Sequence, residues 1–213
     1  MRTHHSLALL VPLALAATAC SEGPTPVAPP AEPAKIAAAA VPACVDFEPP
    51  LAAGTTWGAT VGQPPLTFVH MENGIRVYTE KFSLFGGGTA YRDARIGLPP
   101  FVFSAGQAAR TLHINLIFDF TGIGFTPSSY TFDYYDPNGN NAYENLKINA
   151  SGVFIGELNA PPASLGGSFI SFAAGPFAAP PSGDWARIKL SPVVNRLTVG
   201  GQDLWIDHVC ANP

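Results

Sequence analysis

Apolar and polar residues alternate along most of the chain beyond residue 43, with the two-residue period of β-strands. The clearest case is residues 113–120, where every second residue from Ile114 to Phe120 is apolar. Residues 130–135 alternate in the same way. Further short segments of this kind are 45–48, 66–71, 75–82, 101–103, 146–148, 153–158, 168–172, 185–190, 196–199 and 204–209. This pattern predicts an all-β protein.

Turn signals between these segments indicate antiparallel pairing. Asn73-Gly74 joins two strand-like runs, and both residues tolerate the positive φ of a tight hairpin turn. Helical periodicity is limited to one turn at 104–110. We therefore predict a single antiparallel β-sandwich domain of the jelly-roll type over residues 43–213.

A short loop separates the strands at 113–120 and 130–135, so we expect these two strands to pair. One face of the pair is then apolar and the other is solvated, as in an antiparallel sheet with one exposed side. The polar candidates for ligand contact on the solvated face are Asn115, Asp119, Asp133 and Tyr135.

The composition fits short strands and tight turns better than helices. Charged residues make up only 12% of the chain, against about 25% in an average protein, while it holds 21 Gly, 22 Pro and 14 Phe. The net charge is -4 and no basic stripe is present, so nucleic acid is not an expected partner.

The N-terminus has the organisation of a signal peptide, predicted over residues 1–19. A polar start with Arg2 precedes an apolar run from Leu7 to Ala17, which is too short to span a bilayer as a stable helix. Ala17-Thr18-Ala19 then fits the small-x-small rule for cleavage. The protein is therefore expected to be exported.

Residues 17–20 resemble a bacterial lipobox, which implies that Cys20 is lipidated and becomes the mature N-terminus. The Pro- and Ala-rich residues 20–42 then form an extended tether, and the membrane is a partner through the lipid. Ser21 after the cysteine is similar to the pattern that directs lipoproteins to the outer membrane or cell surface. The alternative is a secreted protein with a free thiol at Cys20.

Cysteine content predicts one disulfide. The chain has three cysteines, and lipidation of Cys20 leaves Cys44 and Cys210 at the two ends of the domain. Disulfides persist in exported proteins, so we expect these two to be bridged. Two unpaired buried thiols are the alternative.

The sequence contains no nucleophile elbow, no HExxH pair and no Gly-rich loop that opens a helix. It therefore favours a non-catalytic protein. One alternative is a secreted glycan hydrolase that uses paired carboxylates such as Asp119 and Asp133.

A structural calcium ion is the one cofactor considered. The loop after residue 135 places oxygen-bearing Asp136, Asn138 and Asn140 at alternate positions, as at the start of an EF-hand loop. Asn141 and Lys147 depart from that motif, and a plain hairpin loop is the alternative.

The segments 45–48 and 200–209, together with Gly54-Thr55, resemble the first and last strands of bacterial extracellular jelly-roll modules. These are similar to galactose-binding-like and carbohydrate-binding domains. The resemblance implies a structural calcium held by Glu48 and Asp207. With Cys44 and Cys210 bridged, strand parity lets these carboxylates meet only through a bulge or a strand end.

Sugar binding would use an aromatic ring together with polar groups, and the candidate rings are Trp57, Trp185, Tyr135, Tyr143 and Trp205, the last in an alternating strand. Core packing is the alternative for this residue. The leading hypothesis is a surface-anchored, non-catalytic module that binds carbohydrate or another cell-envelope component. A purely architectural role in the envelope is the remaining alternative.

Overall fold

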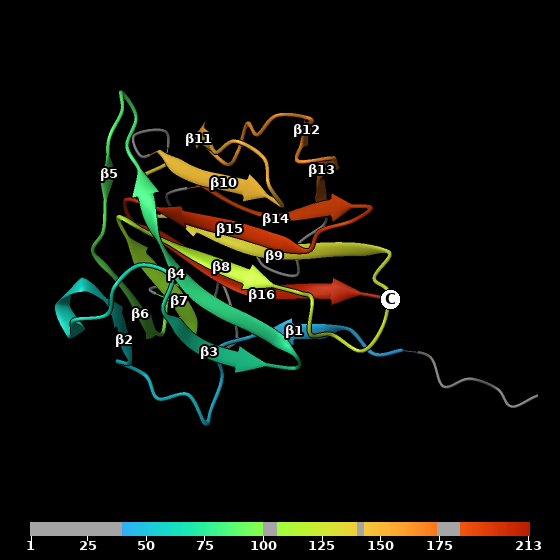
Figure 1. Cartoon of the computed structure of the whole chain (residues 1–213), viewed down its shortest axis with the longest axis horizontal. Coiled ribbons are helices and arrows are strands. Elements are labelled where there is room, and N and C mark those ends of the chain that lie inside the picture. Colours follow the sequence, from blue (N-terminus) through green and yellow to red (C-terminus); the bar gives the residue numbers. More distant parts are fainter. Residues whose placement is uncertain (1–39, 100–105, 140–142, 174–183) are drawn as a thin grey trace, which may run out of the picture. The chain divides into compact units, whose positions relative to one another are not determined.

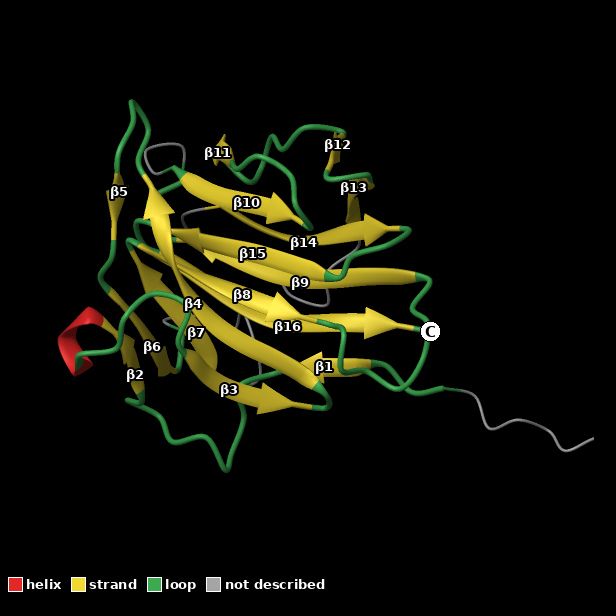
Figure 2. Ribbon diagram, viewed as in Figure 1, coloured by secondary structure: helices red, strands yellow, loops and turns green. Residues whose placement is uncertain are grey.

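A computed structural model describes residues 40–99, 106–139, 143–173 and 184–213. Two antiparallel sheets pack face to face as a β-sandwich (Figure 1 and Figure 2), which confirms the predicted all-β class. Within the described ranges, the one helical element is a 3-10 turn, η1 (Ala59–Val61). The jelly-roll type stays a prediction. The predicted signal peptide, Cys20, most of the tether and the strand expected at 101–103 lie outside the described residues.

The larger sheet has nine strands, and its order places the last strand of the chain near the centre. β16 pairs with β9 on one side, and with both β7 and β1 on the other. The strands in spatial order are β12 (Ser164–Leu165), β13 (Ser168–Ala173), β14 (Asp184–Ser191), β9 (Ser129–Asp136), β16 (Leu204–Asn212), β7 (Ala108–Leu112), β6 (Asp93–Gly97) and β2 (Thr56–Gly58), with β1 (Ala43–Val45) beside β16.

The smaller sheet has seven strands and lies in front of the larger one in Figure 1. Its hairpin at Asn73-Gly74 confirms the turn prediction, because both residues have positive φ, 49° and 84°. The strands in spatial order are β11 (Phe154–Gly156), β10 (Glu144–Ile148), β15 (Arg196–Gly201), β8 (Ile114–Asp119), β4 (Ile75–Ser83) and β3 (Phe68–Glu72), with β5 (Thr89–Ala90) beside β4.

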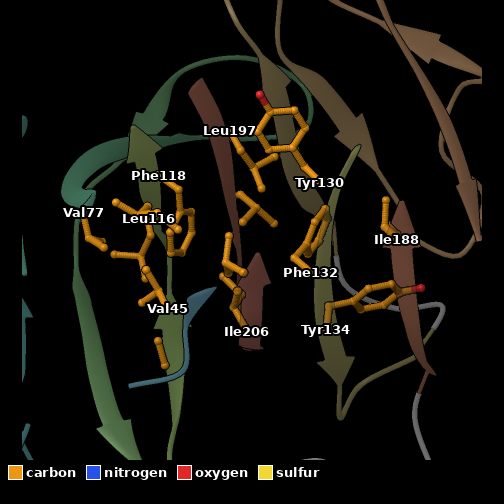
Figure 3. Packing of buried hydrophobic residues seen from close by; sticks show 14 of the residues in the cluster. Val45, Val77, Leu116, Phe118, Tyr130, Phe132, Tyr134, Ile188, Leu197 and Ile206 are labelled. Atoms are coloured by element: carbon orange, nitrogen blue, oxygen red, sulfur yellow. The ribbon is translucent and has the colours of Figure 1, made fainter. Parts of the chain in front are cut away.

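The hydrophobic core fills the space between the sheets. Figure 3 shows Leu116 and Phe118 of the smaller sheet packed with Phe132 and Ile206 of the larger one, all of them fully buried. Burial of a side chain of this size contributes about 1.5–3 kcal/mol. The alternate residues of the same strands must then point to the two outer faces.

The disulfide between Cys44 and Cys210 is present, with an S–S distance of 2.06 Å. The two residues are direct partners in the β1–β16 pair, on the outer face of the larger sheet. The first strand of the domain is therefore covalently linked to the last.

The expected pairing of residues 113–120 with 130–135 is wrong. β8 pairs with β4 and β15, whereas β9 pairs with β14 and β16, so the connection between β8 and β9 crosses from one sheet to the other. The helical turn expected at 104–110 is also not formed in its described part, because β7 begins at Ala108.

Candidate functional site

A transverse row of large side chains crosses the outer face of the larger sheet. Cross-strand pairing places Arg95 next to Arg110, Arg110 next to Trp205, and Trp205 next to Tyr135. Trp185 follows Tyr135 on the next strand. The row therefore runs from β6 to β14 and changes from cationic to aromatic along its length.

The cationic end of this row forms a cleft of about 640 Å³, which we call the Trp205 cleft. Its described lining includes Arg95, Arg110, Asp203, Trp205 and the 72% exposed Leu98. The cleft combines one aromatic ring, several aliphatic side chains that include Leu98, and three charged groups, which is the usual composition of a small-ligand site.

Arg110 is fixed in this cleft by two contacts. Its Nε and Nη2 donate to the two carboxylate oxygens of Asp203, each at 2.6 Å. Its guanidinium carbon lies 5.7 Å from the centroid of the Trp205 ring, in cation–π geometry. The hydrogen bonds from Arg110 to Asp203 raise the pKa of this guanidinium above its ordinary value.

Arg95 supplies the net charge of the cleft. Its side chain is exposed, and it makes no ion pair with another residue in the described ranges. Asp203 is the single carboxylate in the described lining and is already paired with Arg110. The Trp205 cleft thus carries one positive charge without a local counter-charge.

Tyr135 is a supporting residue rather than part of the cleft surface. It is fully buried and packs with Trp205, Trp185 and Ala108 on the outer side of the sheet. Trp205 itself is 7% exposed, so its indole is held firmly and presents only a small part of its surface to the cleft.

A second polar group lies on the same face, beside the disulfide. Asp46 follows β1, while Asp207 and His208 belong to β16 and Asp133 to β9. His208 Nδ1 lies 3.0 Å from Asp207 Oδ2 and 3.9 Å from Asp133 Oδ2, and its Nε2 lies 3.9 Å from Asp46 Oδ1. We call these four residues the carboxylate–histidine cluster.

The geometry of this cluster depends on a bulge in β16. The β9–β16 register shifts between Asp207 and Cys210, and His208 adopts a φ of 47°. This extra residue brings Asp207 to the same face as Cys210 and therefore next to Asp46, since Asp46 follows Cys44 by two residues.

Glu48 makes a different contact from the one predicted. Its Oε1 accepts a hydrogen bond from the backbone N–H of Gln107 at 2.8 Å. The bulge that the parity argument required is present, but it brings Asp46 to Asp207. The ligand pair implied by the resemblance, Glu48 with Asp207, is thus not among the groups of metal-ligating side chains that the described residues bring together.

The electrostatics of the cluster are dominated by negative charge. The hydrogen bond to Asp207 raises the pKa of His208, and the charges of Asp46 and Asp133 act in the same direction. Burial raises the pKa of Asp46, and the nearby carboxylate of Asp207 adds to this rise. Arg187 balances Asp133 through two hydrogen bonds of 2.6 Å.

The loop considered for calcium is described only in part. Asp136 Oδ1 accepts a hydrogen bond from the backbone N–H of Asn138 at 2.8 Å, which is a local turn contact. Asn140 lies outside the described residues. Asp136 also shares a hydrogen bond with Glu144, and burial raises the pKa of Asp136 to about 6 and that of Glu144 to about 8.

Asn115 and Asp119 lie on the outer face of the smaller sheet, away from the other predicted ligand residues. Asn115 Nδ2 donates to the Lys81 carbonyl at 3.0 Å. Asp119 accepts hydrogen bonds from Arg76 and from Thr121. Asp119 and Asp133 are on opposite outer faces, so the structure does not bring them together as a catalytic pair.

No sequence pattern singles out Asp46, His208, Arg95 or the Arg110–Asp203 pair as site residues. Arg110 and Asp203 are 93 positions apart and give no local signal. Asp46 and His208 each lie two residues from a bridged cysteine. Once the disulfide is predicted, these two spacings are enough to predict that Asp46 and His208 lie near each other.

No family model, curated protein or solved structure matches this chain. In the described part of the chain, no helix is long and apolar enough to cross a membrane.

Proposed function

We propose that the domain is a non-catalytic binding module, held at the outer membrane or cell surface by a lipid on Cys20, that binds an envelope glycan in the Trp205 cleft. The observation that carries this proposal is the composition of the cleft, which joins the Trp205 ring to the fixed guanidinium of Arg110 and to that of Arg95, which has no ion pair among the described residues. Aromatic and aliphatic surface suits the C–H faces of a sugar, and the charged groups suit its hydroxyls.

The charge of the cleft narrows the ligand class. Arg110 is neutralised by Asp203, whereas Arg95 is exposed without an ion pair in the described ranges. A planar guanidinium binds carboxylate through two parallel hydrogen bonds. An acidic saccharide, such as one that contains uronic acid, is therefore favoured over a neutral one.

The same geometry favours binding over hydrolysis. Glycoside hydrolysis ordinarily needs two facing carboxyl groups, and the described lining of the cleft holds Asp203 alone. That carboxylate accepts both of its hydrogen bonds from Arg110. A carboxylate that is already hydrogen-bonded to a guanidinium through both oxygens is poorly suited to act as a general acid or base.

The test is a binding measurement with the purified full-length chain and matched acidic and neutral oligosaccharides. We expect the acidic ligand to bind more tightly, and Arg95→Ala to weaken that binding at least about tenfold while leaving the fold intact. Arg92→Ala is the control, because Arg92 is also exposed but is not in the described cleft lining. The absence of binding to any envelope glycan would reject the proposal in favour of an architectural role.

A further inference from the structure

We propose that Asp46, Asp207 and His208 form a binding site for a first-row divalent transition-metal ion, with Zn²⁺ as the best-suited ion. This site is separate from the Trp205 cleft and does not depend on glycan binding.

The donor set matches this class of metal. The three residues each offer one ligand atom, and these atoms all lie within 4.8 Å of one another. Zn²⁺ takes nitrogen and carboxylate ligands at about 2.0–2.2 Å, which places ligand atoms about 3–4 Å apart in a tetrahedral shell. The 3.0 Å between His208 Nδ1 and Asp207 Oδ2 falls in this range, whereas Asp46 Oδ1 lies 3.9 Å from the other ring nitrogen, Nε2.

Charge provides an independent argument. Three carboxylates meet here, those of Asp46, Asp133 and Asp207, and Arg187 directs two hydrogen bonds to Asp133. With a neutral His208, these three carboxylates outnumber the one guanidinium, which acts on both Asp133 and Asp207. A charge of this kind is costly to desolvate without a counter-ion. One divalent cation balances it.

The side chain of Asp46 gives the most direct evidence that a counter-ion would be favourable. Its Oδ1 is buried and has no hydrogen-bond partner in the described ranges. The carboxylates that raise the pKa of Asp46 include Glu48 and Glu72 in addition to Asp207, whereas His208 acts in the opposite direction. This oxygen, which lies 3.9 Å from His208 Nε2, is therefore well suited to be a ligand for a positive ion.

The backbone holds the ligands in place before any ion binds. Asp46 follows β1 directly, and β1 is linked to β16 by the Cys44–Cys210 disulfide. The backbone N–H of Asp46 donates to Glu72 Oε2 at 3.3 Å, and the bulge fixes Asp207 and His208 on the other strand. Such pre-organisation reduces the entropic cost of binding a metal ion.

The imidazole distinguishes this site from a calcium site. Ca²⁺ takes six to eight oxygen ligands, whereas a histidine nitrogen suits Zn²⁺ and its neighbours in the first transition row. A proton on His208 is the competing source of positive charge. A protonated His208 would make the same contacts without giving the site any affinity for metal. A direct binding measurement therefore distinguishes a bound metal ion from a bound proton.

The experiment is calorimetric titration of the full-length chain, oxidised and freed of metal with a chelator, with ZnCl₂ and in parallel with CaCl₂. We expect one zinc ion per chain and much weaker calcium binding. His208→Asn and Asp46→Asn should each weaken zinc binding at least about tenfold. His113→Asn is the matched control, because His113 and His208 have positive φ values of 51° and 47°, which asparagine tolerates.

A second measurement uses the unaltered protein, so its result cannot come from unfolding of a variant. The ring-nitrogen NMR resonances of His208 should shift on addition of zinc, while those of His113 stay unchanged. Absence of zinc binding, binding that His208→Asn leaves unaltered, or equal affinity for calcium would each overturn the proposal. Arg95→Ala should keep its zinc affinity, so failure of the glycan proposal and failure of this one give different results.

Discussion

Asp133 and Asp207 lie directly opposite each other in the pairing of β9 with β16, and both carboxylates are almost fully buried. Arg187, the partner of Asp133 on the other side, donates two hydrogen bonds to it at 2.6 Å. The guanidinium of Arg187 is thus hydrogen-bonded to Asp133 and also acts on the charge of Asp207. The stability of this face of the sheet depends on that contact.

Replacing Arg187 with alanine should destabilise the domain strongly. Loss of one partner leaves Asp133 buried beside Asp207 without its counter-charge, which typically costs about 3–5 kcal/mol. Urea unfolding of the oxidised chain measures the change. Lys189→Ala on the same strand is the control, because Lys189 is exposed, and its effect should stay within about 0.5 kcal/mol. Equal losses in the two variants would show that the Arg187–Asp133 contact does not stabilise the fold.

The sequence predicted the sandwich well because strand alternation is a local property. The hairpin at Asn73-Gly74 and the faces of β8 and β9 follow from neighbouring residues alone. The pairing of β8 with β9 failed because a loop of this length can either turn back within a sheet or cross to the opposite one. Only packing of the complete domain decides between these connections.

The difference between local alternation and packing of the complete domain also explains which candidate site residues lie together. Asp133 and Tyr135 were predicted to share a solvated face; they do share the outer face of the larger sheet with Trp205, but both are buried. Asn115 and Asp119 were placed with them through the incorrect pairing. The partner of Asp207 was missed by two residues because the His208 bulge has no sequence signature that alternation can detect.

The Cys44–Cys210 disulfide should make a large contribution to stability. It closes a loop with a sequence separation of 166 residues, and the chain-entropy model gives about 4–5 kcal/mol for a loop of that size. The double variant Cys44→Ala, Cys210→Ala should lose roughly 2–5 kcal/mol in urea unfolding. Cys20→Ser is the control for removal of a cysteine outside the pair. A double variant as stable as the oxidised chain would mean that the strand pairing alone holds β1 in place.

Gly200 is expected to be sensitive to the addition of a single methyl group. A Cβ at this position would overlap the backbone carbonyl oxygen of Ile114 on the neighbouring strand β8. Since backbone in the centre of a sheet cannot move freely, Gly200→Ala should cost about 1–3 kcal/mol. Gly124→Ala is the control, because a Cβ there meets open space. Thermal unfolding of both variants tests this, and similar melting temperatures would contradict it.

The buried pair of Asp136 and Glu144 should make stability depend on pH. Burial raises the pKa of Glu144 to about 8, well above its ordinary value of about 4.3, so the folded state retains a proton that the unfolded chain releases. Stability from this group is therefore complete below pH 4 and decreases as the pH rises towards 8. The slope is at most about 1.4 kcal/mol per pH unit for one proton.

Glu144→Gln should remove that slope, since glutamine is neutral at every pH and keeps an oxygen that can accept the hydrogen bond from the Leu158 N–H. Urea unfolding between pH 5 and pH 8, in the presence of a chelator, should show the variant gaining stability relative to the wild type as the pH rises. His208, whose pKa is also raised, titrates in both proteins and therefore cancels in the difference. Glu80→Gln, a half-buried glutamate that lies 3.6 Å from Lys147 at the outer face of the smaller sheet, should give a difference that does not grow with pH. A constant difference for Glu144→Gln as well would show that Glu144 is ionised in the folded state, with the negative charge balanced by another group.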